Sequence, residues 1–337
     1  MDYTVAMQRA IALSEKGLGK CAPNPIVGAV IIDASGKIIG EGFHNRMTSK
    51  DHAEVVAIRS AGDLAKGATM VVTLEPCNHT GSTGPCTQAI IDSGISTVVF
   101  AVKDPNAVAA GGADALRAAG IKVIDGILAK EASYVNRAWL TKIEKSRPYF
   151  IWKVATTLDA KIAASDGTSK WISNEVSRSD VQRLRRGSDA ILVGTNTVVS
   201  DNPHLIPRGE FSGYTHNPIR VIFGERELPA DSKVFDNSAE TIQVKSRDLN
   251  NLVAKLNELD INQVFVEAGS TLASAMLTAG LLDELVIYQA PALLGSGKSF
   301  FADDSNLTIE DQIHLEHIST EVLAGDVKSV YRIGVGV

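Results

Sequence analysis

The sequence predicts an α/β protein built from two consecutive domains. At 337 residues the chain exceeds the usual size of one hydrophobic core. Both halves alternate short apolar runs of β type with helical stretches, the pattern of sheets covered by helices. A proline in "SRPYF" follows a helical stretch that it cannot continue. We therefore place the boundary near Ser146, between domains of residues 1–145 and 146–337.

The first domain is expected to contain a mixed sheet with helices on both faces. In chain order, "TVAMQRAIALSEKG" predicts a helix, "IVGAVIID" and "KIIGEGF" predict strands around the turn "ASG", and "HAEVVAIRSAG" predicts a helix. Then "ATMVVTLEP", "STVVFAV" and "IKVIDG" predict strands, separated by the helices "CTQAIIDSG" and "GADALRAAG". One helix, "SYVNRAWLTKIEK", is expected to close the domain.

The second domain repeats the alternation without repeating the sequence of the first. Strands are expected at "YFIWKVATT", "AILVG", "IRVIFG", "TIQVK", "QVFVEAG" and "DELVIYQAP", and helices at "DVQRLRRGSD", "LNNLVAKLNEL" and "TLASAMLTAG". The segments "IHLEHIS" and "VKSVYRIG" predict two final strands. "LLGSGKS" lacks the first glycine of a phosphate-binding P-loop, because Ala292 occupies that position, so it predicts only a turn.

Composition and charge indicate a cytoplasmic protein that acts on small molecules. Hydrophobic residues make up 45% of the chain, but the longest apolar runs are far too short to span a bilayer, and residues 1–20 lack an export signal. Residues 1–145 hold 15 basic and 14 acidic residues, and residues 146–337 hold 18 and 25. Neither half has the basic excess expected of a nucleic-acid-binding protein, and no membrane contact is expected.

Two of the three cysteines lie close together in "TLEPCNHTGSTGPC". A reducing cytoplasm argues against a disulfide and favours a metal site or a catalytic pair. Cys21 stands apart and is interpreted as a small buried apolar residue.

His52, Cys77 and Cys86 are candidate zinc ligands that leave a fourth position for water. Glu54 follows His52 by two residues and is the candidate general acid and base. His-x-Glu, then Pro-Cys and a second cysteine, is the pattern of hydrolytic zinc deaminases, in which two residues normally separate the cysteines. Here eight residues separate them, and we expect the inserted loop to shape the substrate pocket. A closed structural zinc site, or three unrelated buried residues, is the alternative interpretation.

The second domain lacks the GxGxxG fingerprint of a Rossmann dinucleotide site. "VEAGSTLASAMLTAG" instead joins a strand to a helix through glycine and small hydroxyl residues. Such a helix start can bind a cofactor phosphate, although an ordinary N-cap fits the pattern equally well.

The chain resembles the bifunctional riboflavin-biosynthesis deaminase/reductase family. The resemblance rests on "PNPIVGAVI", "GEGFH", "HAEVVA", "VTLEPCNHTGSTGPC", "VKDPN", "SKWIS", "TVVSDNPHL" and "VEAGSTL", which span nearly the whole chain in order. It implies a cytidine-deaminase-like mixed-sheet α/β/α domain and a dihydrofolate-reductase-like α/β domain. It further implies Zn²⁺ and NADPH as cofactors, a pyrimidine ribosyl phosphate as substrate, and a homo-oligomer.

The resemblance also assigns site residues. Substrate positions of the first domain match Asn24, His44, His79, Lys103 and Asn106. Cofactor positions of the second domain match Ala155, Trp171, Thr197, Asp201, Gly269, Ser270, Thr271, Leu272, Ala273, Ser274 and Ala275, and its substrate positions match Ser169, Arg185, Leu205, Arg208 and Glu267. The two asparagines fit turn chemistry equally well, and the two histidines could instead be surface residues.

Arg185 and Arg208 suit the 5′-phosphate, Glu267 suits sugar hydroxyls, and Lys153 or Asp201 could deliver a proton during hydride transfer. Besides Thr157, which keeps the hydroxyl of the usual serine, two departures from the family pattern affect the second domain. Ala160 stands where glycine is usual, which predicts an altered turn because alanine does not readily take positive φ. Gly224 stands where aspartate is usual, which puts nearby cofactor contacts in question.

Two other functions stay open from the sequence. The first domain could deaminate another nucleoside or a nucleic-acid base beside a non-catalytic second domain, although low aromatic content (5%) argues against nucleic acid. Alternatively, the chain could be a nucleotide sensor or structural protein that keeps zinc without catalysis. Glu54 argues against this possibility, since a structural site needs no free carboxylate.

Overall fold

A computed structural model describes residues 2–81, 84–106, 108–213, 216–301 and 308–334. The chain divides into two compact units, Met1–Arg147 and Pro148–Val337. Among the described residues, no helix is long and apolar enough to cross a membrane.

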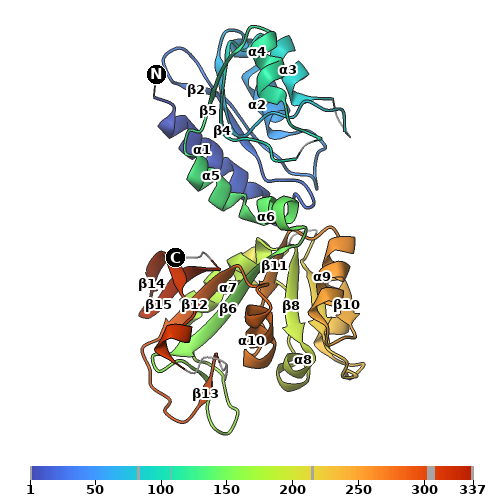
Figure 1. Ribbon diagram of the computed structural model, residues 1–337, viewed down its shortest axis with the longest axis vertical. Coiled ribbons are helices and arrows are strands. Elements are labelled where there is room, and N and C mark those ends of the chain that lie inside the picture. Colours follow the sequence, from blue (N-terminus) through green and yellow to red (C-terminus); the bar gives the residue numbers. More distant parts are fainter. Residues whose placement is uncertain (1, 82–83, 107, 214–215, 302–307, 335–337) are drawn as a thin grey trace. The chain divides into compact units, whose positions relative to one another are not determined.

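The first unit is a five-stranded mixed sheet between two helical layers (Figure 1). The strands are β1 (Gly28–Ile32), β2 (Ile38–Phe43), β3 (Thr69–Leu74), β4 (Thr97–Val102) and β5 (Lys122–Asp125), in the order β2-β1-β3-β4-β5. Strand β1 runs antiparallel to β2 and β3, whereas β3, β4 and β5 are parallel. The helices are α1 (Thr4–Ser14), α2 (Ala53–Ala61), α3 (Cys86–Asp92), α4 (Gly112–Ala118), α5 (Ala129–Val135) and α6 (Arg137–Lys145).

Alternate residues of the central strands enter two separate cores. Ala29 and Ile31 of β1 pack with α2, α3 and α4, while Val30 and Ile32 pack with α1 and α5. Because helices cover both faces, all of β1 is buried, and the strands read as continuous apolar runs rather than as an alternation.

The closing segment of this unit forms two helices where the sequence predicted one. α5 ends at Val135 and α6 begins at Arg137, separated by Asn136. The side chain of Asn136 accepts a hydrogen bond from the backbone N–H of Ile26 (3.2 Å). This long-range contact, which no local pattern encodes, accompanies the interruption of the helix.

The second unit has an eight-stranded sheet in the order β10-β9-β8-β11-β6-β12-β15-β14. Its strands are β6 (Tyr149–Thr157), β8 (Ala190–Gly194), β9 (Ile219–Phe223), β10 (Thr241–Val244), β11 (Gln263–Val266), β12 (Glu284–Ala290), β14 (Leu315–Leu323) and β15 (Asp326–Ile333). A separate two-stranded sheet pairs β7 (Lys161–Ala163) with β13 (Lys298–Ser299). The helices are α7 (Glu175–Arg186), α8 (Thr195–Asp201), α9 (Leu249–Glu258) and α10 (Ser270–Thr278).

Six neighbouring strands of the large sheet, from β10 to β12, are parallel, and the β14–β15 hairpin adds an antiparallel edge. Helices α9 and α10 pack their apolar residues on this sheet, with Leu252, Leu256 and Met276 fully buried. Parallel strands bring their carboxyl ends to the same edge of a sheet, where ligands commonly bind in α/β proteins.

Candidate active sites

Three predicted metal ligands converge in the first unit. His52 precedes α2 in an extended conformation, Cys77 follows β3, and Cys86 is the first residue of α3. The Nδ1 atom of His52 lies 3.3 Å from Sγ of Cys86 and 3.6 Å from Sγ of Cys77. Tetrahedral zinc with ordinary bond lengths would separate nitrogen and sulfur ligands by about 3.5 Å. The triangle therefore fits a zinc ion.

The pKa values of the two cysteines also favour the binding of a cation. The contact between the two sulfurs, aided by the His52 imidazole, lowers the pKa of Cys77 to about 4. The same contact and burial raise the pKa of Cys86. The two sulfurs thus share one proton, which a divalent cation can replace because it binds both as thiolates.

Glu54, in the first turn of α2, is 4% exposed. Burial raises the pKa of its carboxyl group, with the charge of His52 opposing the shift. Its Oε2 atom has no hydrogen-bond partner among the described residues. A buried carboxylate oxygen without a partner is costly, so it indicates a place for a missing donor.

A cavity of about 360 Å³ opens beside the cluster. Of the predicted residues, His52, Glu54, Cys77, Asn24, His79 and Asn106 line it. Within the inserted loop, Gly81 also lines the cavity, whereas Ser82 and Thr83 lie outside the described residues. The described part of the loop therefore does border the pocket.

His44 and Lys103 do not line this cavity. His44 is 3% exposed, so the interpretation of it as a surface histidine is wrong. Its Nδ1 donates to the carbonyl of Asp51 (3.0 Å), which leaves Nε2 to accept from the Asn24 amide (3.3 Å). The His44 ring also packs edge-on against His52, 5.2 Å between centroids. His44 therefore contacts both Asn24 and His52 without lining the cavity itself. Lys103 is exposed.

Sequence reasoning missed two carboxylates on the cavity wall, the buried Glu75 and the partly buried Asp104. Glu75 accepts hydrogen bonds from the backbone N–H groups of Ala113 (2.8 Å) and Asp104 (3.2 Å), so it connects the start of α4 and the loop after β4 to the end of β3. Asp104 also lines the cavity, and burial raises the pKa of its carboxyl group. Both lie in quoted motifs, "LEPC" and "KDPN", yet nothing local shows that these motifs meet.

Helix α6 supplies another part of the wall that the sequence did not predict. Trp139, Lys142 and Ile143 line the cavity at the i, i+3, i+4 spacing of one helix face. The helical periodicity of the sequence could have identified this face of α6, but not that the face lines the cavity.

The second unit has a cavity of about 450 Å³ near the carboxyl ends of β6 and β11. The predicted residues that line it are Ala155, Ser169, Trp171, Arg185, Thr197, Asp201, Leu205, Arg208, Glu267 and Gly269. The rest of the predicted cofactor segment, from Ser270 to Ala275, is not part of the wall. Ala273 is fully buried in the core, so its side chain faces away.

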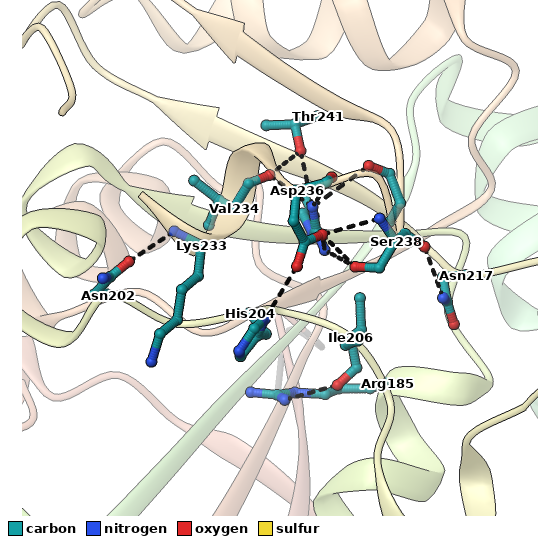
Figure 2. Close-up of polar contacts among 12 residues, drawn as sticks. Arg185, Asn202, His204, Ile206, Asn217, Lys233, Val234, Asp236, Ser238 and Thr241 are labelled. Carbon is teal, nitrogen blue, oxygen red and sulfur yellow. Dashed lines mark hydrogen bonds and ion pairs between the residues drawn. The ribbon is translucent and has the colours of Figure 1, made fainter. Parts of the chain in front are cut away.

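Arg185 and Glu267 form a two-pronged ion pair in this cavity. Nε and Nη2 of Arg185 lie 3.0 Å and 2.6 Å from the two carboxylate oxygens of Glu267. Nη1 donates to the carbonyl of Ile206 (3.2 Å), as Figure 2 shows. Burial opposes ionisation of Glu267, but Arg185, Lys153 and Arg208 outweigh it and lower its pKa. The Arg185 fork is therefore occupied by Glu267, whereas Arg208 has no ion pair within the described ranges.

The two candidate proton donors both line the cavity. Burial lowers the pKa of Lys153, against the opposing charge of Glu267. A lysine with a lowered pKa transfers a proton more readily near neutral pH than an ordinary lysine does. Asp201 lies at the end of α8 and is exposed.

The two departures from the family pattern have different consequences. Ala160 takes the left-handed conformation itself (φ 62°) and donates to the carbonyl of Thr157 (3.0 Å), so a turn that suits glycine forms with alanine. At Gly224 φ is 133°, and an added Cβ would lie 2.9 Å from Oγ1 of Thr195. Any residue with a Cβ at position 224 would therefore require Thr195 or the local backbone to shift.

Comparisons with known proteins match both units. The family model of the cytidine and deoxycytidylate deaminase zinc-binding region matches residues 2–102, and that of the RibD C-terminal domain matches residues 148–329. The riboflavin biosynthesis protein RibD of Mycobacterium tuberculosis is 42% identical over 324 residues, covering 96% of this chain and 95% of that protein. RibD of Escherichia coli is 40% identical, covering 86% and 88%.

Solved structures agree with this relationship. Acinetobacter baumannii RibD superposes with a TM-score of 0.89 at 36% identity, over 98% of both chains. A Thermotoga maritima diaminohydroxyphosphoribosylaminopyrimidine deaminase/5-amino-6-(5-phosphoribosylamino)uracil reductase gives the same TM-score and identity, over 98% of this chain and 99% of that one.

Fold, cavities and matches together define a zinc-dependent deaminase fused to an NADPH-dependent reductase. A non-catalytic second domain is not favoured, because residues 148–329 match the RibD C-terminal domain. The chain belongs to the RibD family of bifunctional riboflavin-biosynthesis enzymes.

Proposed function

We propose that residues 1–145 remove the 2-amino group of 2,5-diamino-6-ribosylamino-4(3H)-pyrimidinone 5′-phosphate, and that residues 146–337 then reduce its ribosyl group to ribityl. The observation that carries the proposal is the His52, Cys77 and Cys86 triangle beside the unpartnered carboxylate oxygen of Glu54. A purely structural metal site would not need this carboxylate.

His52, Cys77 and Cys86 would hold the zinc ion. When bound, zinc lowers the pKa of a coordinated water so that a nucleophile is available near neutral pH. Glu54 would accept the proton of the attacking water at its free Oε2 and deliver it to the departing amine. Burial raises its pKa, which makes its carboxylate a stronger proton acceptor than that of an exposed glutamate.

Asn24, His79 and Asn106 would bind the substrate from the cavity wall. His44 is a positioning residue, since its contacts go to Asn24 and His52. Glu75 would keep the Asp104 and Asn106 loop in place through its hydrogen bond to Asp104. A substrate contact of Lys103 stays a prediction from the resemblance.

The N-terminus of α10 fits a cofactor phosphate. Gly269 caps this nine-residue helix without a side-chain hydrogen bond, and no heavy atom lies within 4 Å of where its Cβ would be. Free N–H groups at a helix start favour an anion. The free N–H groups of Ser270, Thr271 and Leu272 would thus hold a phosphate of NADPH, whose nicotinamide supplies the hydride, and Ala155, Trp171, Thr197 and Asp201 would line the rest of its site. A cofactor contact of Ala273, Ser274 and Ala275 stays a prediction from the resemblance.

Ser169, Leu205 and Arg208 would bind the reductase substrate, and Arg208 is the guanidinium open to its phosphate. Arg185 already holds the carboxylate of Glu267, so this ion pair would bind the sugar rather than the phosphate. Lys153 and Asp201 are the groups on the wall that can deliver a proton to the opened sugar.

Substrate choice tests the proposal. Purified protein should release ammonia from the pyrimidinone phosphate and then consume NADPH, but should not deaminate cytidine or single-stranded DNA. Turnover of cytidine without turnover of the pyrimidinone phosphate would overturn it.

We further propose a cytoplasmic location, where NADPH is supplied, and a homo-oligomeric state, both inferred from the family. Sedimentation of the purified protein tests the second, and a monomer at micromolar concentration would contradict it.

A further inference from the structure

Among the residues that line the reductase cavity outside the family-derived site positions are His204 and Lys233. His204 lies in the loop after α8, and Lys233 begins a short 3₁₀ helix, Lys233–Phe235. Figure 2 shows His204 in contact with Asp236 and the backbone of Lys233 in contact with Asn202, with both side chains extending towards the side on which Arg185 lies.

The network holds His204 through a buried arginine. Arg220 is fully buried, and its Nη2 lies 2.7 Å from Oδ1 of Asp236. Its Nη1 donates to the backbone carbonyls of Val234 (2.6 Å) and Asp236 (3.1 Å). The second carboxylate oxygen of Asp236 lies 3.2 Å from Nδ1 of His204.

Asp236 therefore stays an anion behind the imidazole. Hydrogen bonds from the hydroxyl of Ser238 and from Arg220 hold the pKa of Asp236 well below its usual range, against the effect of burial. A carboxylate that accepts the Nδ1 hydrogen fixes the orientation of the ring, as in catalytic triads. Nε2 then lies on the edge of the ring away from Asp236, and the ring is part of the cavity wall.

Lys233 is fixed at its backbone. Its N–H donates to Oδ1 of Asn202 (2.8 Å), which is also on the cavity wall. The ammonium group of Lys233 has no ion pair with any residue that the structure describes, and the same holds for Arg208. Two cations without carboxylate partners thus face one cavity.

The charge of the whole wall points to an anionic ligand. Among its described residues are six lysines and arginines but only two carboxylates, Asp201 and Glu267. Glu267 is already paired with Arg185. A cavity with such an excess of one sign concentrates ligands of the opposite sign.

We propose that Lys233 and His204, together with Arg208, form a subsite for a phosphomonoester dianion. The inference rests on the proposed reductase function and adds two residues to its specificity. The phosphate is either the 5′-phosphate of the substrate or the 2′-phosphate of NADPH, which share the same chemistry. Both side chains are expected to affect ligand binding rather than the chemical step.

Equilibrium titration calorimetry of the full-length protein tests the subsite with two probes. Ribose 5-phosphate carries the phosphate of the substrate, and adenosine 2′,5′-bisphosphate carries that of NADPH. Ribose and adenosine 5′-monophosphate are the matched probes that lack the phosphate in question. Lys233→Met and His204→Gln should each weaken one of the two phosphate probes by about tenfold, the usual effect of losing a charge-assisted hydrogen bond.

Lys233→Arg should restore binding because it keeps the charge. The matched controls are Lys245→Met, whose lysine pairs with Glu227, and His317→Gln on β14, because neither residue lines the cavity. The affected probe identifies the source of the phosphate. Unchanged dissociation constants for both probes in both variants would overturn the subsite.

The proposed function is tested separately in the same preparations. NADPH consumption by the wild-type protein supports the reductase, and its absence would contradict the reductase without altering what the titrations say about phosphate binding.

Discussion

The two cavities differ in the sign of their charge. Three carboxylates, Glu54, Glu75 and Asp104, and the cysteine pair line or border the first, against one lysine, Lys142. The second has six lysines and arginines against two carboxylates. An acidic cavity with two cysteines suits a divalent cation and the uncharged pyrimidinone ring of the substrate, whereas a cationic cavity suits the phosphate groups of the substrate and of NADPH. The chain as a whole is acidic, so only the local arrangement reveals this difference.

The largest expected effect comes from removing a zinc ligand. Cys86→Ser should lower ammonia release by more than about 10⁴-fold, because the zinc-dependent nucleophile is lost. NADPH consumption with the deaminated intermediate should be unchanged. Metal content measured by mass spectrometry should fall from one zinc per chain to none.

Cys21→Ser is the matched control, since Cys21 is buried but outside the cluster. It should keep both zinc and ammonia release. Full activity of Cys86→Ser would show that the triangle does not hold the catalytic metal.

Glu54→Gln should come next, because it removes proton transfer and leaves the metal. Ammonia release should fall by about 10²- to 10⁴-fold while zinc content stays the same. The control Glu41→Gln alters a glutamate that pairs with Arg9 and does not line the cavity. Equal kcat values for Glu54→Gln and the wild type would exclude the acid and base role.

Glu267→Gln tests the second cavity, where the carboxylate of Glu267 pairs with Arg185. Removing one partner of a largely buried ion pair should destabilise the second unit by about 3 kcal/mol in chemical unfolding at neutral pH. Because the folded-state pKa of Glu267 is lowered, the wild-type advantage is present above the ordinary glutamate pKa of about 4.3 and is lost as pH falls below it.

The exposed pair of Arg332 and Glu316 supplies the control for that prediction. Glu316→Gln should change stability by less than about 0.5 kcal/mol at any of these pH values. A Glu267→Gln loss that persisted undiminished in acid would show that charge is not its cause.

The smallest effect is expected at Ala160. Its positive φ costs an alanine about 1 kcal/mol that glycine does not incur, although glycine loses part of this gain through its freer unfolded chain. Ala160→Gly should therefore raise the stability of the second unit by at most about 0.5 kcal/mol, measured by denaturant unfolding. A clear loss of stability would mean that the turn is not strained.

Much of the molecule could be predicted from local sequence, and the rest depended on distant contacts. Element alternation predicted the two sheets, and ligand chemistry with short spacing predicted the zinc triangle. Glu75, Lys142, His204 and Lys233 were missed because their loops and helices meet only in the folded chain. The Arg185 fork was assigned to phosphate because the sequence does not show that Glu267 already occupies it.

Zinc removal followed by both assays on one sample is the most direct measurement. After treatment with a chelator, the protein should lose ammonia release but should still consume NADPH when given the deaminated intermediate, and added zinc should restore the first activity. Loss of both activities together, or ammonia release that survives complete zinc removal, would contradict two chemically independent sites.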